Sequence, residues 1–255
     1  MKSTLLICFK EFKGYFVSPI GYAVLALFGL IFGITFSTTV SQMASLGLRA
    51  QMMGQQQPMS VNEMVIRPML GFAGTIVLFL IPMITMRLIA EEKRNGTIEL
   101  LLTSPIEDIE IILGKWLAAV LLYLCVLGMS ALSIGMLFLW GKPDLKPVLV
   151  AYLGLLLQGG CLLAIGTFVS TTTKNQIVAG GVTFFFSLGL YLLNYYTEFA
   201  TGAFWQVLNY LSIVTHMDNF SKGVIDSKDV IFYFSMMFFF LFLTSRSMES
   251  LRWRS

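Results

Sequence analysis

Six long apolar segments restrict the fold of this chain more than any other feature of its sequence. They cover approximately residues 17–38, 69–86, 116–140, 148–171, 177–195 and 230–245, and none of them contains Asp, Glu, Lys, Arg or His. A helix needs about 20 apolar residues to cross the roughly 30 Å hydrocarbon core of a bilayer. Inside lipid, a helix satisfies its own backbone hydrogen bonds. The sequence therefore predicts an all-α membrane protein, with six transmembrane helices in one transmembrane domain over residues 1–255.

The overall composition agrees with this prediction. Hydrophobic residues make up 56% of the chain and charged residues only 12%, whereas soluble domains contain about 25% charged residues. The formal net charge of +3 is too small to indicate a nucleic-acid partner. Cys8, Cys125 and Cys161 lack the spacing of metal ligands, so we expect buried thiols.

The first sixteen residues form a separate amphipathic segment. Apolar side chains recur at helical spacing, while lysines occupy the positions expected to face water. Charges interrupt the apolar run, which excludes a secretory signal peptide. We expect a helix lying in the membrane interface over residues 3–16, before Ser18 and Pro19 turn the chain inward. An extension of the first span is the alternative.

The distribution of Lys and Arg predicts the orientation. With both termini in the cytoplasm, eleven basic residues lie inside and six outside, as the positive-inside rule requires. The inner set is Lys2, Lys10, Lys13, Arg87, Lys93, Arg94, Lys115, Lys174, Arg246, Arg252 and Arg254. The connection between spans two and three, residues 87–115, is then cytoplasmic.

This connection has the pattern of a folded segment. The second span is expected to continue as a helix through Ala90–Arg94 and to end at Asn95 and Gly96, which tolerate the left-handed conformation. A short amphipathic helix is expected over Thr97–Thr103. Ser104, Pro105 and Glu107 then form an N-cap, a first helical residue and a capping box.

The apolar face of the short helix, formed by Ile98, Leu101 and Leu102, needs a surface that covers it. The lipid interface, the protein's own spans and a cytosolic partner are all candidates. A solvated loop with snorkelling charges is the alternative.

No pattern in the chain indicates catalysis. The phosphate-loop pattern is absent, because the segment Leu113–Trp116 lacks both its first glycine and its hydroxyl residue. No nucleophile–base pair is recognisable, and the only histidine, His216, is expected at the surface of the last outer loop. We therefore predict that the chain is not an enzyme and carries no cofactor or metal of its own.

Two segments resemble one family of transport proteins. The sequence EEKRNGTIELLLTSP (91–105) is similar to the cytoplasmic signature of type-2 ATP-binding-cassette (ABC) exporter permeases. The sequence KEFKGYFVSPIGY (10–22) resembles the N-terminal elbow helix of that family, particularly of its gliding-motility-like and copper-enzyme-maturation branch. The two motifs cover about 35 residues, and the six spans extend the resemblance to the whole chain.

The resemblance implies that the cytoplasmic segment is a coupling helix docking on a separate ATP-binding subunit, which holds ATP and Mg. It also implies export, pairing with a second permease chain and a multi-pass location in the plasma membrane, which is the inner membrane in bacteria. The matching docking positions are Glu91, Glu92, Arg94, Gly96, Thr97, Glu99, Leu100, Leu101, Ser104 and Pro105.

Weaker signals lie in and around the spans. Gln158, Asn194 and Tyr195 could line a transport pathway, or they could join helices by hydrogen bonds. The Gly29–Gly33 pair indicates close helix packing, within the chain or in a dimer. The last outer loop, residues 196–229, is apolar enough for a re-entrant or interfacial helix.

The first outer loop contains Met43, Met52, Met53, Met59 and Met64. Thioethers are soft ligands for Cu(I), but methionine is also a flexible packing residue.

Three classes of function remain open at this point: an ATPase-driven permease, which we favour, an ion-coupled carrier or channel, and a membrane scaffold or assembly factor without cargo. The absence of ionisable residues from the spans disfavours an ion-coupled carrier, although sodium coordination by carbonyl groups remains possible.

Overall fold

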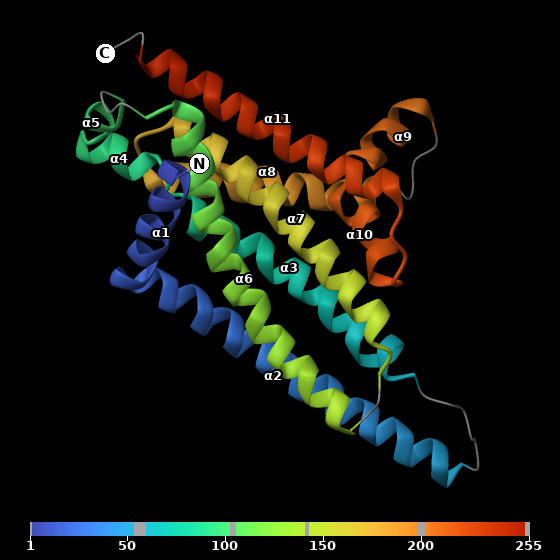
Figure 1. Ribbon diagram of the computed structural model, residues 1–255. Coiled ribbons are helices and arrows are strands. Elements are labelled where there is room, and N and C mark those ends of the chain that lie inside the picture. The colour runs from blue at the N-terminus through green and yellow to red at the C-terminus, as the bar shows by residue number, and fades with distance from the viewer. Residues whose placement is uncertain (1, 54–59, 103–105, 141–142, 198–201, 253–255) are drawn as a thin grey trace.

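The computed structural model describes residues 2–53, 60–102, 106–140, 143–197 and 202–252. Within these ranges the chain forms only helices and turns (Figure 1). Six helical segments are long and apolar enough to cross a membrane, which confirms the predicted all-α, six-span fold. They contain α2 (Pro19–Met52), α3 (Arg67–Thr85), α6 (Asp108–Trp140), α7 (Leu145–Thr172), α8 (Gln176–Thr197) and α11 (Ser227–Arg252).

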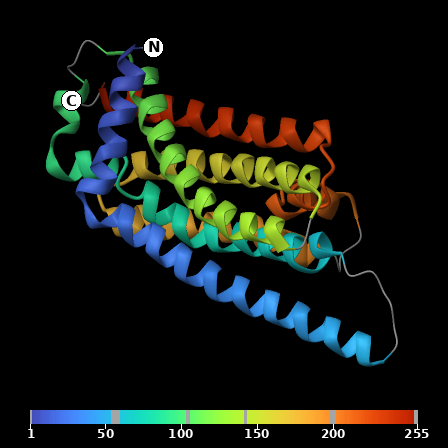
Figure 2. The same ribbon diagram turned by 60° about the horizontal axis from the view of Figure 1, so that its bottom comes forward.

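The shorter helices lie at the two ends of the bundle. The N-terminal helix α1 (Lys2–Val17), α4 (Ala90–Asn95) and α5 (Ile98–Leu102) gather at one end, together with the last turns of α11 (Figures 1 and 2). The helices α9 (Ala203–Tyr210) and α10 (Ile213–Ser221) lie at the other, so the expected helix in the last outer loop is present. We call these the α4–α5 end and the α9–α10 end.

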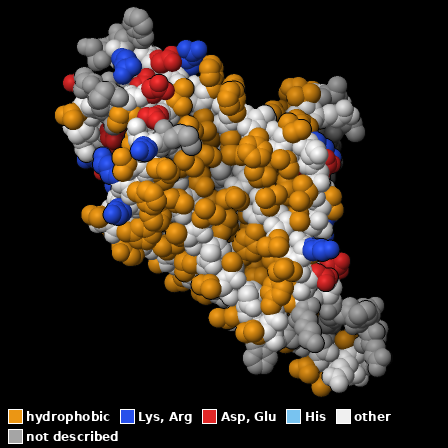
Figure 3. Space-filling model, in the orientation of Figure 1, with side chains coloured by type: hydrophobic (Ala, Val, Ile, Leu, Met, Phe, Trp, Pro, Cys, Tyr) orange, Lys and Arg blue, Asp and Glu red, His pale blue; other side chains and the backbone are white. Residues whose placement is uncertain are grey.

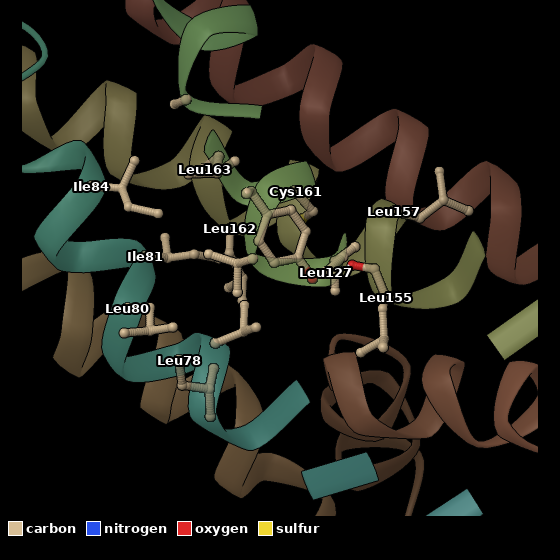
Figure 4. Close-up of a cluster of buried hydrophobic side chains, with 14 of the residues drawn as sticks. Leu78, Leu80, Ile81, Ile84, Leu127, Leu155, Leu157, Cys161, Leu162 and Leu163 are labelled. Atoms are coloured by element: carbon tan, nitrogen blue, oxygen red, sulfur yellow. Dashed lines mark hydrogen bonds between the residues drawn. The ribbon is translucent and has the colours of Figure 1, made fainter. Parts of the chain in front are cut away.

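The spans α7 and α3 form the centre of the bundle. In their most apolar windows, 72% of α7 and 67% of α3 is buried, against 22% of α2 and of α8. Figure 4 shows part of the core between α3, α6 and α7. It includes Leu78, Leu80, Ile81, Ile84, Leu127, Leu155, Leu157, Cys161, Leu162 and Leu163, all of which are buried. The predicted burial of Cys8 and Cys161 is confirmed, and Cys125 is partly buried.

Glycine permits close contacts between these helices. A Cβ at Gly159 of α7 would lie 2.1 Å from Cε1 of Tyr123 in α6. A Cβ at Gly29 of α2 would lie 2.6 Å from Cε of Met129, whereas one at Gly33 would meet nothing within 4 Å. The first glycine of the Gly29–Gly33 pair therefore serves packing within the chain.

Two spans begin or end differently from the prediction. Helix α2 continues to Met52 instead of ending near residue 38, and a π-helical turn, η1 (Asn62–Ile66), precedes α3. The segment after residue 38 is polar but contains no proline, and its hydroxyl groups bond back to the helix. Thr39 Oγ1 donates to the Thr35 carbonyl at 2.8 Å, and Ser41 Oγ to the Ser37 carbonyl at 2.8 Å. The polar segment after residue 38 therefore does not end the helix.

The junction between the second span and the α4–α5 end also differs. We expected one helix to run through Ala90–Arg94, but α3 ends at Thr85, a turn occupies residues 86–89, and α4 starts at Ala90. Pro82 lies inside α3 and has no backbone N–H, which weakens the last part of the helix. Helix α4 is consequently a separate short helix. Contacts with elements other than α3 hold it in place.

Candidate functional site

The helices α4 and α5 meet at a left-handed glycine. Gly96 has φ of 73°, and it separates Asn95, the last residue of α4, from the start of α5. Residues other than glycine adopt this conformation at a steric cost. The predicted break at Asn95-Gly96 is confirmed. Thr103, Ser104 and Pro105 lie outside the described residues, so the predicted capping box is not tested.

A serine from another span holds the start of α4. Ser170 Oγ in α7 accepts hydrogen bonds from the backbone N–H groups of Ile89 at 3.1 Å and Ala90 at 3.0 Å. The first N–H groups of a helix have no partner within the helix, and a side-chain oxygen normally caps them from the preceding residue. Lys93 Nζ also donates to the Thr171 carbonyl. Helix α4 is therefore fastened directly to the end of α7.

A buried lysine connects α4 with two further helices. Lys115 of α6 is 2% exposed, and its Nζ lies 2.9 Å from Glu11 Oε1 of α1 and 2.8 Å from Glu92 Oε1 of α4. Removing a charge from water costs several kcal/mol, roughly, unless opposite charges surround it closely. The two carboxylates provide that compensation. This ion cluster joins three helices that are distant in the sequence.

A second polar group lies beside the ion cluster. Arg87 Nε donates to Glu91 Oε2 at 2.8 Å, and its Nη1 donates to Ser18 Oγ at 2.6 Å. Tyr15 Oη donates to the Ile84 carbonyl at 3.1 Å. Burial raises the pKa of Tyr15 well above its usual range, which keeps the phenol protonated as a donor. Arg87 thereby ties the junction of α1 and α2 to the turn after α3, and Tyr15 ties α1 to the end of α3.

These charged groups surround a pocket of about 230 Å³, whose lining includes Glu11, Arg87, Glu91, Glu92 and Lys115. Three carboxylates and two cations face it. Glu92 Oε2 is buried and has no hydrogen-bond partner among the described residues. Because Glu92 contacts Lys115 directly, any displacement of α4 disturbs the position of α6 and α1 as well.

The predicted docking residues divide into two groups. Glu91 and Glu92 point into the pocket, whereas Arg94, Gly96, Thr97, Glu99 and Leu100 lie at the surface. The Leu100 side chain is 79% exposed, while Ile98 packs against the core of the bundle. The side chains of Leu101 and Leu102 lie outside the described part of the chain. Leu100 is thus exposed on one side of α5, and Ile98 anchors the helix to the bundle on another side.

The three possible pathway residues do not share one environment. Gln158 is 3% exposed and lines a cavity of about 500 Å³ with Arg67, Gly74, Thr75, Tyr191, Asp218 and other residues. Its Oε1 has no hydrogen-bond partner in the described structure. Asn194 Oδ1 accepts a hydrogen bond from Thr215 Oγ1 at 3.2 Å, which joins α8 to α10, and Tyr195 is 52% exposed. Only Gln158 lies at the cavity.

The prediction that His216 lies at the surface is wrong. The side chain is 2% exposed, and its Nδ1 lies 2.6 Å from Oδ1 of Asp229, itself 1% exposed. The ring stacks on Phe232 with centroids 3.9 Å apart. Helix α10 folds back against the spans, so the outer segment that carries this histidine is part of the packed structure.

The methionines of the first outer segment are spread over several environments. Met52 and Met53 are exposed at the end of α2, and Met43 is partly buried against the core. Met59 lies outside the described residues. In the described ranges, no group of three or more His, Cys, Asp and Glu side chains could hold a metal ion.

Comparison with known protein families gives a match over most of the chain. Residues 5–245 match the family model described as ABC-2 family transporter protein. No curated protein matches the chain. The matched range covers five of the six spans in full and most of the sixth, both motifs that suggested the resemblance, and the ion cluster around Lys115.

Proposed function

The chain belongs to the ABC-2 transporter family and is a permease subunit of an ABC transporter, and from this premise we propose that a separate ATP-binding subunit docks on α4 and α5 and drives export. The sequence has no phosphate loop, so ATP and Mg would reside on that partner. The excess of Lys and Arg around the α4–α5 end favours a cytoplasmic location for it, with both termini inside and the chain in the plasma membrane.

The observation that carries this proposal is the position of Lys115. A partner that displaces α5 also displaces α4, because only Gly96 and Thr97 separate the two helices. The motion reaches α6 and α1 through Glu92, Lys115 and Glu11, and it reaches α7 through Ser170. Displacement of this short segment therefore reaches two spans, α6 and α7, and the N-terminal helix α1. An ion-coupled carrier would have no use for such a transmitting cluster.

The transport pathway is proposed to include the cavity at Gln158. Six spans make a small transport unit, and the family works with two permease chains. We therefore expect a homodimer or a pair with a sister permease, surrounded by membrane lipid. Gln158 offers an unpaired amide oxygen deep in the bundle, and a buried polar group without a partner is costly unless a ligand or water uses it. Asn194 and Tyr195 would border this pathway from α8.

The docking proposal is tested with substitutions in α5. Leu100→Asp and Leu101→Asp place a charge where a partner would exclude water, so each should abolish co-purification of the ATP-binding subunit. Lys174→Asp, at the exposed turn between α7 and α8, is the matched control. The variants should reach the membrane at normal levels, because the changes lie outside the apolar spans. Full retention of the ATP-binding subunit by both Leu variants would show that this subunit does not dock on α5.

A further inference from the structure

A groove runs between α6 and α11 near the α4–α5 end. It encloses about 460 Å³, a size within the range of about 300–1,000 Å³ for ligand pockets. Its walls are formed almost entirely by aliphatic and aromatic side chains, with Ile109, Ile112 and Leu113 on α6 and Phe238, Leu241 and Phe242 on α11. It shares no residue with the ion cluster or with the cavity at Gln158.

The groove opens on an exposed apolar surface of the bundle. Phe238 is 75% exposed and Ile109 is 56% exposed. Further along α11, Ile231 and Phe234 continue the same exposed apolar row at helical spacing. Figure 3 shows hydrophobic side chains over much of the face between the charged groups at the two ends. Since these helices span the bilayer, the molecules that meet this row are lipids, and the groove is continuous with it.

An arginine stands at the polar rim of the groove. Arg246 is the first basic residue after the uncharged segment of α11, and it lies at the groove together with Glu249. Its Nη1 donates to Glu249 Oε2 at 2.8 Å, and its guanidinium carbon lies 5.1 Å from the centroid of the Phe242 ring. These two contacts hold the cation at the boundary between the apolar groove and water.

The remaining donors of Arg246 suit a phosphate. A guanidinium carries five N–H donors in a planar fork that matches phosphate oxygens. Within the described residues, one of its nitrogens is engaged, by Glu249. The side chain of Arg246 is 61% exposed, so the rest of the fork is accessible from the membrane surface.

We propose that this groove is a phospholipid site, in which one acyl chain occupies the space between α6 and α11 and the phosphate bonds to Arg246. The occupant comes from the leaflet next to the α4–α5 end, where the headgroup level and Arg246 coincide. The site goes beyond the proposed transport function, because it requires neither the ATP-binding subunit nor a second permease chain.

The test is native mass spectrometry of the full chain with phosphatidylglycerol and with diacylglycerol of identical acyl chains. The unmodified protein should prefer phosphatidylglycerol, because only that lipid carries a phosphate. Arg246→Ala should lower its occupancy about fivefold, the effect of one basic residue near an anionic lipid surface. Arg246→Lys should keep part of the preference, and Glu249→Ala should increase it by releasing the guanidinium. Lys174→Ala, at an exposed basic residue of the same end, is the control.

A photoreactive residue at Phe238 identifies the occupant directly. Transfer of the label to lipid supports the site. Transfer to a second copy of the chain or to another protein overturns it, because the groove would then be a protein interface. Equal binding of the two lipids by the unmodified protein, or unchanged phosphatidylglycerol occupancy in Arg246→Ala, would also overturn it and indicate apolar filling without a phosphate site.

Discussion

His216 Nδ1 lies 2.6 Å from Asp229 Oδ1, and both side chains are buried where α10 folds against α11. The other ring nitrogen, Nε2, lies 2.8 Å from the carbonyl oxygen of Tyr210. Both ring nitrogens therefore lie within hydrogen-bond distance of an oxygen atom. Asn219 Nδ2 donates to the second carboxylate oxygen at 2.7 Å. Every polar atom of the pair has a partner.

Removing one member of this pair should destabilise the protein strongly. Asp229→Ala leaves the buried His216 Nδ1 and the Asn219 side-chain amide without their partner, and each buried polar group left without a partner costs about 1–3 kcal/mol. The free energy of unfolding in detergent measures the loss. Lys228→Ala, which breaks the exposed pair with Asp226, should lower the free energy of unfolding far less, because water screens that pair. Similar losses in the two variants would mean that the buried pair holds α10 no better than a surface contact does.

The ion cluster around Lys115 should act on coupling as well as on stability. Lys115→Gln leaves Glu11 and Glu92 facing each other without a cation, which separates α4 from α1 and α6 by repulsion. We expect the ATP-binding subunit still to bind, because the exposed residues of α5 are unchanged, while ATP hydrolysis no longer drives transport. The ratio of substrate moved to ATP hydrolysed, in reconstituted vesicles, measures this. Lys222→Gln, at an exposed ion pair, should keep the normal ratio. A normal ratio in Lys115→Gln would exclude the cluster from transmission.

The sequence predicted the features that depend on local physics. Six apolar segments of sufficient length predicted six spans, and Asn95-Gly96 predicted a helix end because few other residues tolerate a positive φ. The break was found at Gly96, with φ of 73°. Helix α2 continues beyond the predicted span, to Met52, because a polar segment without proline can remain helical.

Features that depend on contacts between distant segments could not be predicted in this way. Lys115 was counted as one more basic residue on the inner side, because its partner Glu11 lies 104 residues earlier. In the sequence, Ser170 is a polar residue near the end of a predicted span, with no sign of a special role. In the structure its hydroxyl oxygen accepts hydrogen bonds from the first N–H groups of α4. His216 was expected at the surface, since nothing in the chain shows that α10 folds back onto the spans.

Any side chain at position 96 should disturb the junction between α4 and α5. Gly96→Val forces a β-branched residue into the left-handed region, at a cost of roughly 1–2 kcal/mol, and it redirects α5 relative to α4. Membrane insertion should be normal, but binding of the ATP-binding subunit should weaken. Gly33→Val adds the same side chain in a span, at a glycine whose Cβ would meet nothing within 4 Å, and should leave that binding intact. Equal affinity in both variants would show that the direction of α5 does not matter.

The cap that Ser170 provides should be visible in hydrogen exchange. Ser170→Ala removes the acceptor for the N–H groups of Ile89 and Ala90, and loss of a capping side chain costs about 1 kcal/mol. These two amides should exchange faster with deuterium, while amides in the centre of α7 keep their protection, because the substitution loosens α4 locally. Ser130→Ala is the matched control, since Ser130 is also buried but bonds to the Leu127 carbonyl and to Tyr152, away from α4. If the exchange of Ile89 and Ala90 is the same in both variants, α4 is held by Lys93 and the ion cluster alone, and motion of α4 would reach α7 only through Lys93.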